Sequence, residues 1–251
     1  MESLPQSEAR PPAADPDERR TAAGTDEPGP PHLADPRALQ ILSTEHWSLL
    51  TARSLAYNEF FSRGAMFLTF LSASLVALGF VYQDGNPDFV MVLIPVLALD
   101  LFVGLATLGR LVSASSEEIL AVQAMNRIRH AYLEMVPTLD PYISTSPHDD
   151  IGSVLSIYGA TPSRPGLLLN IIHGYTTMPG MIGVLCAAIG GALAGSIAVA
   201  AGADARLAVL LGVVAGVFCA ATLTVMSVRA FQGVARRLVA RFPAPDAVEP
   251  F

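Results

Sequence analysis

The sequence predicts an all-α fold, in which two transmembrane helical hairpins carry long helix extensions into the cytoplasm. Hydrophobic residues make up 52% of the 251 residues and only 15% are charged, whereas a soluble domain carries about 25% charged residues. The apolar residues gather in four runs, and each run is near the ~20 residues that a helix needs to cross a bilayer. The arginines lie almost entirely on one side of these runs.

Residues 1–36 form the first segment, which we expect to be a disordered cytoplasmic tail. They hold eight of the nineteen prolines, with eight acidic and three basic residues, a net charge of −5. So polar a segment cannot bury enough surface to offset its ordering entropy. We expect no cleavable signal peptide, because the first apolar run begins only near Ala65.

Residues 37–136 are predicted to form two long helices. Asp35-Pro36 is a helix start, with Asp as the N-cap and Pro at the first helical position. Apolar positions then recur every three or four residues up to the first span, residues 65–82. A polar turn at 83–87 leads to the second span, residues 89–111. This helix continues outside the membrane until Pro137 ends it.

Residues 137–178 are predicted to be a cytoplasmic loop segment, with an apolar stretch at Val154–Tyr158 and an amphipathic piece at Leu167–His173. Residues 179–228 form the second hairpin, with spans at 181–201 and 207–228. Residues 229–251 are expected to be a basic helix and tail.

The arginines predict the orientation, because loops on the cytoplasmic side are enriched in basic residues. One arginine, Arg206, lies in a turn on the opposite side. Ten flank the spans on the other side: Arg53, Arg63, Arg110, Arg127, Arg129, Arg164, Arg229, Arg236, Arg237 and Arg241. The prediction is a bacterial plasma membrane protein with both termini in the cytoplasm.

Asp100 is the most informative polar residue, because a carboxylate midway along a span costs several kcal/mol and marks a candidate site. Thr107 shares its helix face, and Thr69 and Ser72 of the first span are candidate hydroxyl partners. One interpretation is a proton- or cation-responsive site. The other is a protonated carboxyl that hydrogen bonds to a neighbouring helix and only holds the helices together.

Small residues repeat every four positions in the second hairpin, a spacing that lets helix backbones approach closely. They are Gly183, Ala187, Gly191, Gly195, Gly212 and Gly216. The pattern indicates packing of the two helices within one chain, with an oligomer interface or a pore-lining face as the alternative.

The cytoplasmic segments hold the remaining acidic and histidine groupings. The candidates are Glu45, His46, Glu59, Arg127, His130 and Glu134. His130 and Glu134 share a helix face, but no repeated ligand spacing accompanies them, so we predict polar contacts between helices and neither a metal nor a cofactor. Nucleotide-binding and nucleophile motifs are absent, and no basic stripe points to nucleic acid.

Three stretches resemble an uncharacterised family of bacterial four-span integral membrane proteins. They are Thr44–Leu50 with Arg53–Glu59, then Met125–Glu134, then His148-Asp149-Asp150. The resemblance extends over about residues 38–230 and implies the same four-span layout. It implies no activity.

Three classes of function follow from these observations. The favoured one is a non-enzymatic membrane sensor, scaffold or effector subunit acting through its cytoplasmic helices. The alternatives are an oligomeric proton or cation pathway centred on Asp100, and a membrane enzyme with a cytoplasmic His/acid site. Besides the bilayer, we expect a homo-oligomer and a cytoplasmic protein as partners, because the helix stripes can pair with a second chain.

Overall fold

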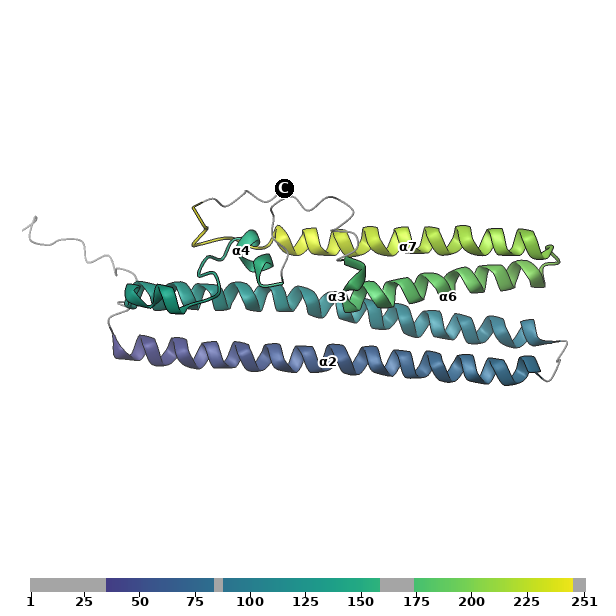
Figure 1. Cartoon of the computed structure of the whole chain (residues 1–251), viewed down its shortest axis with the longest axis horizontal. Helices are drawn as coiled ribbons and strands as arrows, with labels where there is room; N and C mark the ends of the chain where they lie inside the picture. The colour runs from purple at the N-terminus through teal and green to yellow at the C-terminus, as the bar shows by residue number, and fades with distance from the viewer. Residues whose placement is uncertain (1–34, 84–87, 159–173, 246–251) are drawn as a thin grey trace, which may run out of the picture.

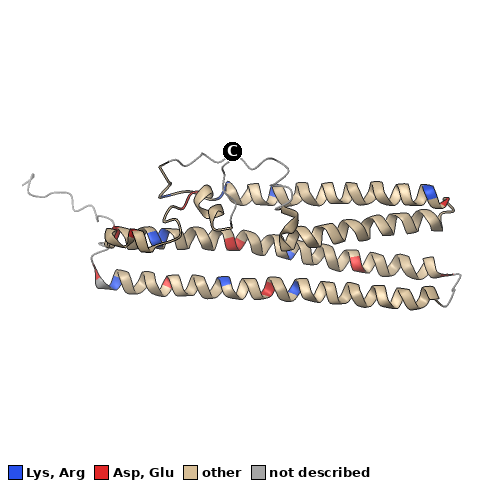
Figure 2. Ribbon diagram, in the orientation of Figure 1, with Lys and Arg blue, Asp and Glu red and all other residues tan. Residues whose placement is uncertain are grey.

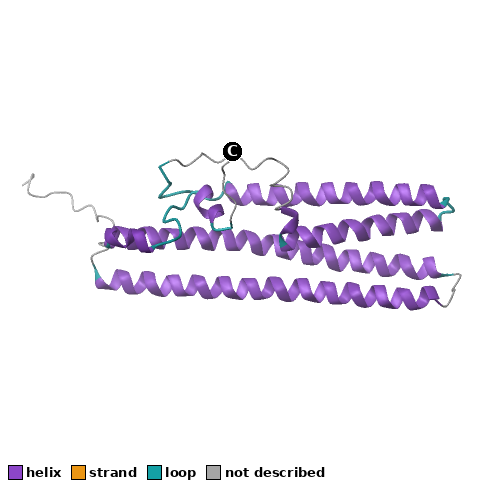
Figure 3. Cartoon of the chain, viewed as in Figure 1, coloured by secondary structure: helices purple, strands orange, loops and turns teal. Residues whose placement is uncertain are grey.

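The computed structural model describes residues 35–83, 88–158 and 174–245, and every regular element in these ranges is a helix (Figure 3). The elements are α2 (Pro36–Gln83), α3 (Phe89–Met135), the 3-10 helix η1 (Pro137–Tyr142), α4 (Ile151–Ser156), α6 (Met178–Ala200) and α7 (Ala205–Ala235). The all-α prediction is confirmed. The expectations for residues 1–34, the turn at 84–87, Leu167–His173 and residues 246–251 lie outside the described residues.

Four helices, α2, α3, α6 and α7, are long and apolar enough to cross a membrane, which identifies a multi-pass membrane protein. At about 1.5 Å per residue, α2 and α3 are each about 70 Å long, whereas the hydrocarbon core of a bilayer is ~30 Å thick. Both helices therefore extend far beyond the membrane. They do so at the end that holds Pro36 and Met135, where α6 is absent (Figure 1). We call residues 36–63 of α2 and 112–135 of α3 the stalk.

Both stalk helices begin or end as their sequences predict. The Asp35 carboxylate accepts the backbone N–H of Arg37 at 2.8 Å, so it caps the start of α2. From there α2 continues without a break through the first span. At the other end, α3 stops at Met135, two residues before Pro137, because proline cannot continue the helical hydrogen-bond ladder. α7 ends at Ala235, so Arg236, Arg237 and Arg241 lie beyond the helix predicted to carry them.

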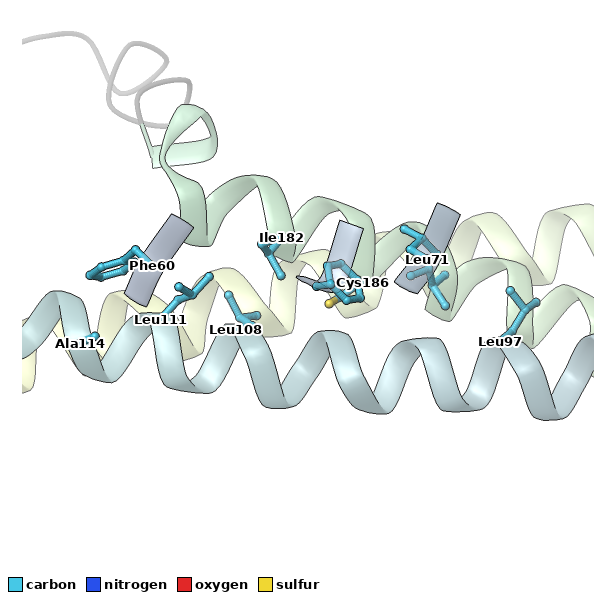
Figure 4. Close-up of a cluster of buried hydrophobic side chains, with 10 residues drawn as sticks. Phe60, Leu71, Leu97, Leu108, Leu111, Ala114, Ile182 and Cys186 are labelled. Carbon is cyan, nitrogen blue, oxygen red and sulfur yellow. The ribbon is translucent and has the colours of Figure 1, made fainter. Parts of the chain in front are cut away.

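The four long helices pack side by side in the order α2, α3, α6, α7 (Figure 1). α3 contacts α2 on one side and α6 on the other, and α6 makes its most extensive contacts with α7. The hydrophobic core lies where α2, α3 and α6 meet (Figure 4). Its buried residues are Phe60, Phe67, Leu71, Leu97, Leu108, Leu111, Ala114, Ile182, Cys186 and Ile189.

Glycines set the closest helix contact, between α6 and α7. A Cβ atom on Gly191 would lie 2.7 Å from the backbone oxygen of Gly212, and one on Gly212 would lie 2.9 Å from the oxygen of Gly191. Gly195 and Gly216 face the same seam, whereas Gly183 faces Leu108 of α3. Most of the repeated small residues thus pack α6 on α7 within one chain.

Charged residues are concentrated toward the stalk end of the molecule (Figure 2). At the far end, Asp204 and Arg206 lie at the start of α7. This distribution leaves long stretches of α2, α3, α6 and α7 with apolar exposed surfaces, as expected of helices that face lipid.

Candidate functional site

Asp100 is completely buried among the helices of the predicted membrane region. The Ser74 hydroxyl of α2 donates a hydrogen bond to its Oδ1 atom at 2.9 Å. Its other oxygen, Oδ2, has no hydrogen-bond partner among the described residues. One hydroxyl partner does not offset the desolvation cost of a carboxylate in apolar surroundings, so Asp100 is a candidate functional residue.

The hydroxyls that the sequence suggested for Asp100 have other roles or positions. Ser72 donates to the backbone oxygen of Leu68, and Thr107 donates to that of Val103. Thr69 is exposed on the surface of α2. Ser74 was missed, although the antiparallel register indicates it: Ser74 and Asp100 are equally far from residue 87 in the turn between the spans.

Apolar atoms close the site around Asp100. One turn further along α3, Gly104 lets Cys186 of α6 and Phe67 of α2 approach, because a Cβ atom there would lie 2.7 Å from the Cys186 sulfur and 3.0 Å from the Phe67 ring. Leu71 and Leu97 belong to the same buried cluster (Figure 4). Within the described residues no continuous row of polar groups leads from Asp100 to either end of the bundle.

A second polar centre lies where α4 and the chain after α7 pack on the stalk. The Asp149 side chain is fully buried. It accepts the Arg127 guanidinium at 2.7 Å and the backbone N–H groups of Arg241 and Phe242 at 3.0 and 2.7 Å. Although burial opposes it, these donors lower the pKa of Asp149 below its ordinary value. The carboxylate therefore ties the segment after α7 to α3.

Neighbouring groups complete this connection, which we call the Asp149 hub (residues 123–130, 148–153 and 238–244). Gln123 donates to the backbone oxygens of Asp149 and Val239, and Asn126 donates to that of His148. Asp150 caps α4 through the N–H of Ser153 and accepts the N–H of Ala244. Backbone groups of two segments, 148–153 and 238–244, are thereby satisfied by one set of side chains.

His130 belongs to the edge of the Asp149 hub. Its ring stacks on Phe242 with centroids 4.0 Å apart, and its Nε2 lies 3.5 Å from a Glu134 oxygen. The described residues contain no group of three His, Cys, Asp or Glu side chains that could hold a metal. The His130–Glu134 pair thus has an aromatic neighbour, and no third ligand among the described residues.

A third polar centre lies between the two stalk helices. Arg53 of α2 pairs with Glu118 of α3 at 3.1 Å, and both side chains are largely buried. Nearer the membrane, Glu59 pairs with Arg63 at 2.8 Å and with Arg110 at 3.3 Å. Near the start of α2, the ring of His46 lies 6.1 Å from that of Tyr132.

The six polar candidates of the sequence are thus distributed over separate places. Arg127 and His130 join the Asp149 hub, Glu59 connects α2 and α3 near the membrane, and His46 faces the far end of α3. Glu45 is exposed. Asp149 and Asp150 accept more hydrogen bonds than any of the six makes, although they are not among the candidate residues predicted from the sequence.

An apolar cavity of about 510 Å³ lies between α3, the start of α6 and α7. Hydroxyl groups line one part of it, those of Ser115, Ser116 and Ser227. Tyr175 closes another part through a 2.9 Å hydrogen bond with Thr224. The rest of the cavity lining is predominantly apolar.

No protein-family model, curated protein or solved structure matches this chain.

Proposed function

We propose that this chain is a non-enzymatic membrane sensor, scaffold or effector subunit of the bacterial plasma membrane, which acts through its stalk. In this proposal both termini and the stalk lie in the cytoplasm. The distribution of arginines supports this orientation, because ten flank the spans on the stalk side and one lies at the opposite turn.

The exposed apolar row on the stalk part of α2 carries the proposal. It consists of Leu39, Trp47, Tyr57 and Phe61, whose spacing keeps them on one side of the helix. Trp47 is 70% exposed and Phe61 is 64% exposed. Large aromatic side chains in contact with water are unfavourable, and they are enriched at protein interfaces.

The rest of the stalk is built as a stable support for this row. The Arg53–Glu118 pair joins α2 to α3, and the Asp149 hub holds the chain after α7 against α3. A rigid support lowers the ordering cost of binding. The partner that we expect on the row is a protein, either a second copy of this chain or another cytoplasmic protein.

The test removes the two most exposed aromatic side chains of the row and is expected to leave the helical fold intact. We expect Trp47→Ala with Phe61→Ala to lower the mass of the purified protein–detergent complex, measured by light scattering, or to release a stoichiometric co-purifying protein. Phe218→Ala is the matched control, because Phe218 is 72% exposed but lies in the membrane part of α7. If the double variant keeps the wild-type mass and composition, the row is not an interface.

A proton or cation pathway centred on Asp100 is the second candidate. It is supported by the buried oxygen Oδ2 that lacks a partner. Flux into liposomes should then be present for the wild type and absent for Asp100→Asn, with both proteins folded and equally oligomeric. Equal flux, or none, in both would leave Asp100 as a contact between helices.

A membrane enzyme with a cytoplasmic His/acid site has the least support. His46, Glu59 and His130 lie near different partners, and an active site requires converging reactive groups.

A further inference from the structure

The junction of α2, α3 and the chain after α4 contains more positive than negative charge. Arg53 pairs with Glu118, and its guanidinium carbon lies 5.9 Å from the centroid of the Tyr158 ring. Arg129 lies on the same face of α3 as Glu118, three turns further along. Arg53 is close enough for its positive charge to act on Arg129, so two guanidinium groups share this region with the Glu118 carboxylate.

Arg129 has no carboxylate partner among the described residues, although it is only partly exposed. Its guanidinium donates a hydrogen bond to the Oδ1 atom of Asn126 at 2.6 Å. The Asn126 amide is neutral, so it does not balance the positive charge of Arg129. Burial, and then the positive charge of Arg53, lower the pKa of Arg129. Because arginine stays protonated in proteins, this location holds an uncompensated cation.

Two further polar atoms at the junction are buried and lack a hydrogen-bond partner of standard geometry: Nδ1 of His46 and the hydroxyl of Tyr158. Burial, and then the charge of Arg129, lower the pKa of His46, so its ring is neutral at pH 7 and can donate one hydrogen bond. Burial and the Glu118 carboxylate, which lies close to the Tyr158 hydroxyl but outside good hydrogen-bond geometry, raise the pKa of Tyr158, so the phenol keeps its proton. Unsatisfied buried groups are uncommon and costly.

We propose that this junction binds an oxyanion, a phosphate or carboxylate group, which pairs with the guanidinium groups of Arg129 and Arg53 and accepts hydrogen bonds from His46 and Tyr158. Guanidinium groups bind both kinds of oxyanion through paired N–H donors. Such a ligand would neutralise the uncompensated charge and satisfy both buried donors at once.

The source of the oxyanion is a solute or the chain itself. Residues 159–173, which follow Tyr158 directly, contain no acidic residue, so they cannot supply it. Residues 1–34 contain seven acidic residues and are joined to the start of α2, ten residues before His46, and residues 246–251 contain two more. A solute and these carboxylates would compete for the same donors.

The experiment follows the thermal unfolding of the full chain in neutral detergent as sulfate replaces chloride at constant ionic strength. We expect the midpoint to rise with the logarithm of the sulfate concentration once that exceeds the Kd, by about 3 °C at ten times the Kd. Arg129→Gln should lose the part of the rise that comes from binding at the junction. Any rise that remains in this variant measures the general salting-out effect of sulfate. Arg37→Gln, at the exposed start of α2, should keep it.

Two further variants keep the test decisive if Arg129→Gln fails to fold. Tyr158→Phe removes only the buried hydroxyl beside Glu118 and should raise the Kd for sulfate several-fold. Arg129→Lys keeps the charge and loses the paired donors, so it should also bind more weakly.

Deletion of residues 1–34 together with 246–251 distinguishes the two sources, because it removes both acidic segments outside the described residues. A response that is present only after the deletion supports the site and identifies the acidic residues of the chain as its occupant. A response in the full chain supports a solute anion. The proposal is overturned if neither protein responds, or if the Arg129 and Tyr158 variants respond as the wild type does.

Discussion

Asp149 connects segments that are far apart in the sequence, because its partners lie on α3 and 92 to 93 residues further along the chain. Removing a buried carboxylate from such a group leaves its donors without partners, at a cost of about 3–5 kcal/mol for a broken buried ion pair. The residue is therefore structural, and its loss has a local consequence that can be measured.

We expect Asp149→Ala to release the segment after α7 from α3. Arg236, Arg237 and Arg241 would then become accessible, so trypsin should cleave there at least ten times faster than in the wild type. Since the chain has no lysine, the cleavage sites can be assigned by mass spectrometry without ambiguity.

Asp140→Ala is the control, because Asp140 is an exposed acid in η1 near the same end of α3. Equal cleavage rates for wild type and Asp149→Ala would show that other contacts hold the segment.

The carboxyl groups of Asp149 and Asp150 determine how the stability of the Asp149 hub depends on pH. The pKa values of Asp149 and Asp150 are lowered from the ordinary 3.8. The unfolded chain therefore binds their protons more readily than the folded chain does, and stability falls as the pH falls. We expect hydrogen exchange in residues 238–244 to be slow above about pH 5 and to accelerate, beyond its intrinsic pH dependence, below pH 3.8.

Asp149→Asn should weaken this pH dependence, because one of the two titrating groups is gone. An unchanged acid response in that variant would contradict the assignment.

At the scale of the elements, the contact between α6 and α7 depends on the absence of side chains. We expect Gly191→Ala to destabilise the protein by about 1–3 kcal/mol, because its Cβ atom would lie 2.7 Å from a backbone oxygen that cannot move aside cheaply. The midpoint of thermal unfolding in detergent measures this loss.

Gly79→Ala is the matched control in the membrane part of α2. A Cβ atom there meets nothing within 4 Å, so the change should stabilise the helix by about 0.5–1 kcal/mol. If both variants unfold at the wild-type temperature, the close approach of α6 and α7 is not required for stability.

The stalk is the element-scale feature with the clearest functional meaning. An isolated pair of helices in water is held together by its apolar seam, and here Phe60, Val122, Met125 and Ile128 are buried. The exposed apolar row of α2 lies outside this seam. Apart from Tyr57, whose ring contacts Arg53 and Phe60, it is surface that the fold of one chain leaves exposed.

At the scale of the whole molecule, the orientation of the bundle can be tested directly. Single cysteines are introduced at Ala201 and Asp140 in a chain whose Cys186 and Cys219 are alanine. On intact cells, a maleimide that cannot cross the membrane should label Ala201→Cys and leave Asp140→Cys unlabelled. The reverse pattern would place the stalk outside the cell.

The four long helices, and their suitability for a bilayer, could be predicted from the sequence. This was possible because a membrane helix satisfies its own backbone hydrogen bonds, so its presence depends on local composition and length. The start of α2 at Pro36 and the end of α3 at Met135 followed from capping and proline chemistry, which are equally local.

Which polar groups meet depends on how the helices pack, and this could not be predicted from the sequence. Ser74 reaches Asp100 through the antiparallel register of α2 and α3, and the Asp149 hub joins residues more than ninety positions apart. The imbalance of charge around Arg129 likewise appears only when α2, α3 and Tyr158 are brought together. Such contacts depend on packing between elements, and no local pattern of residues specifies their partners.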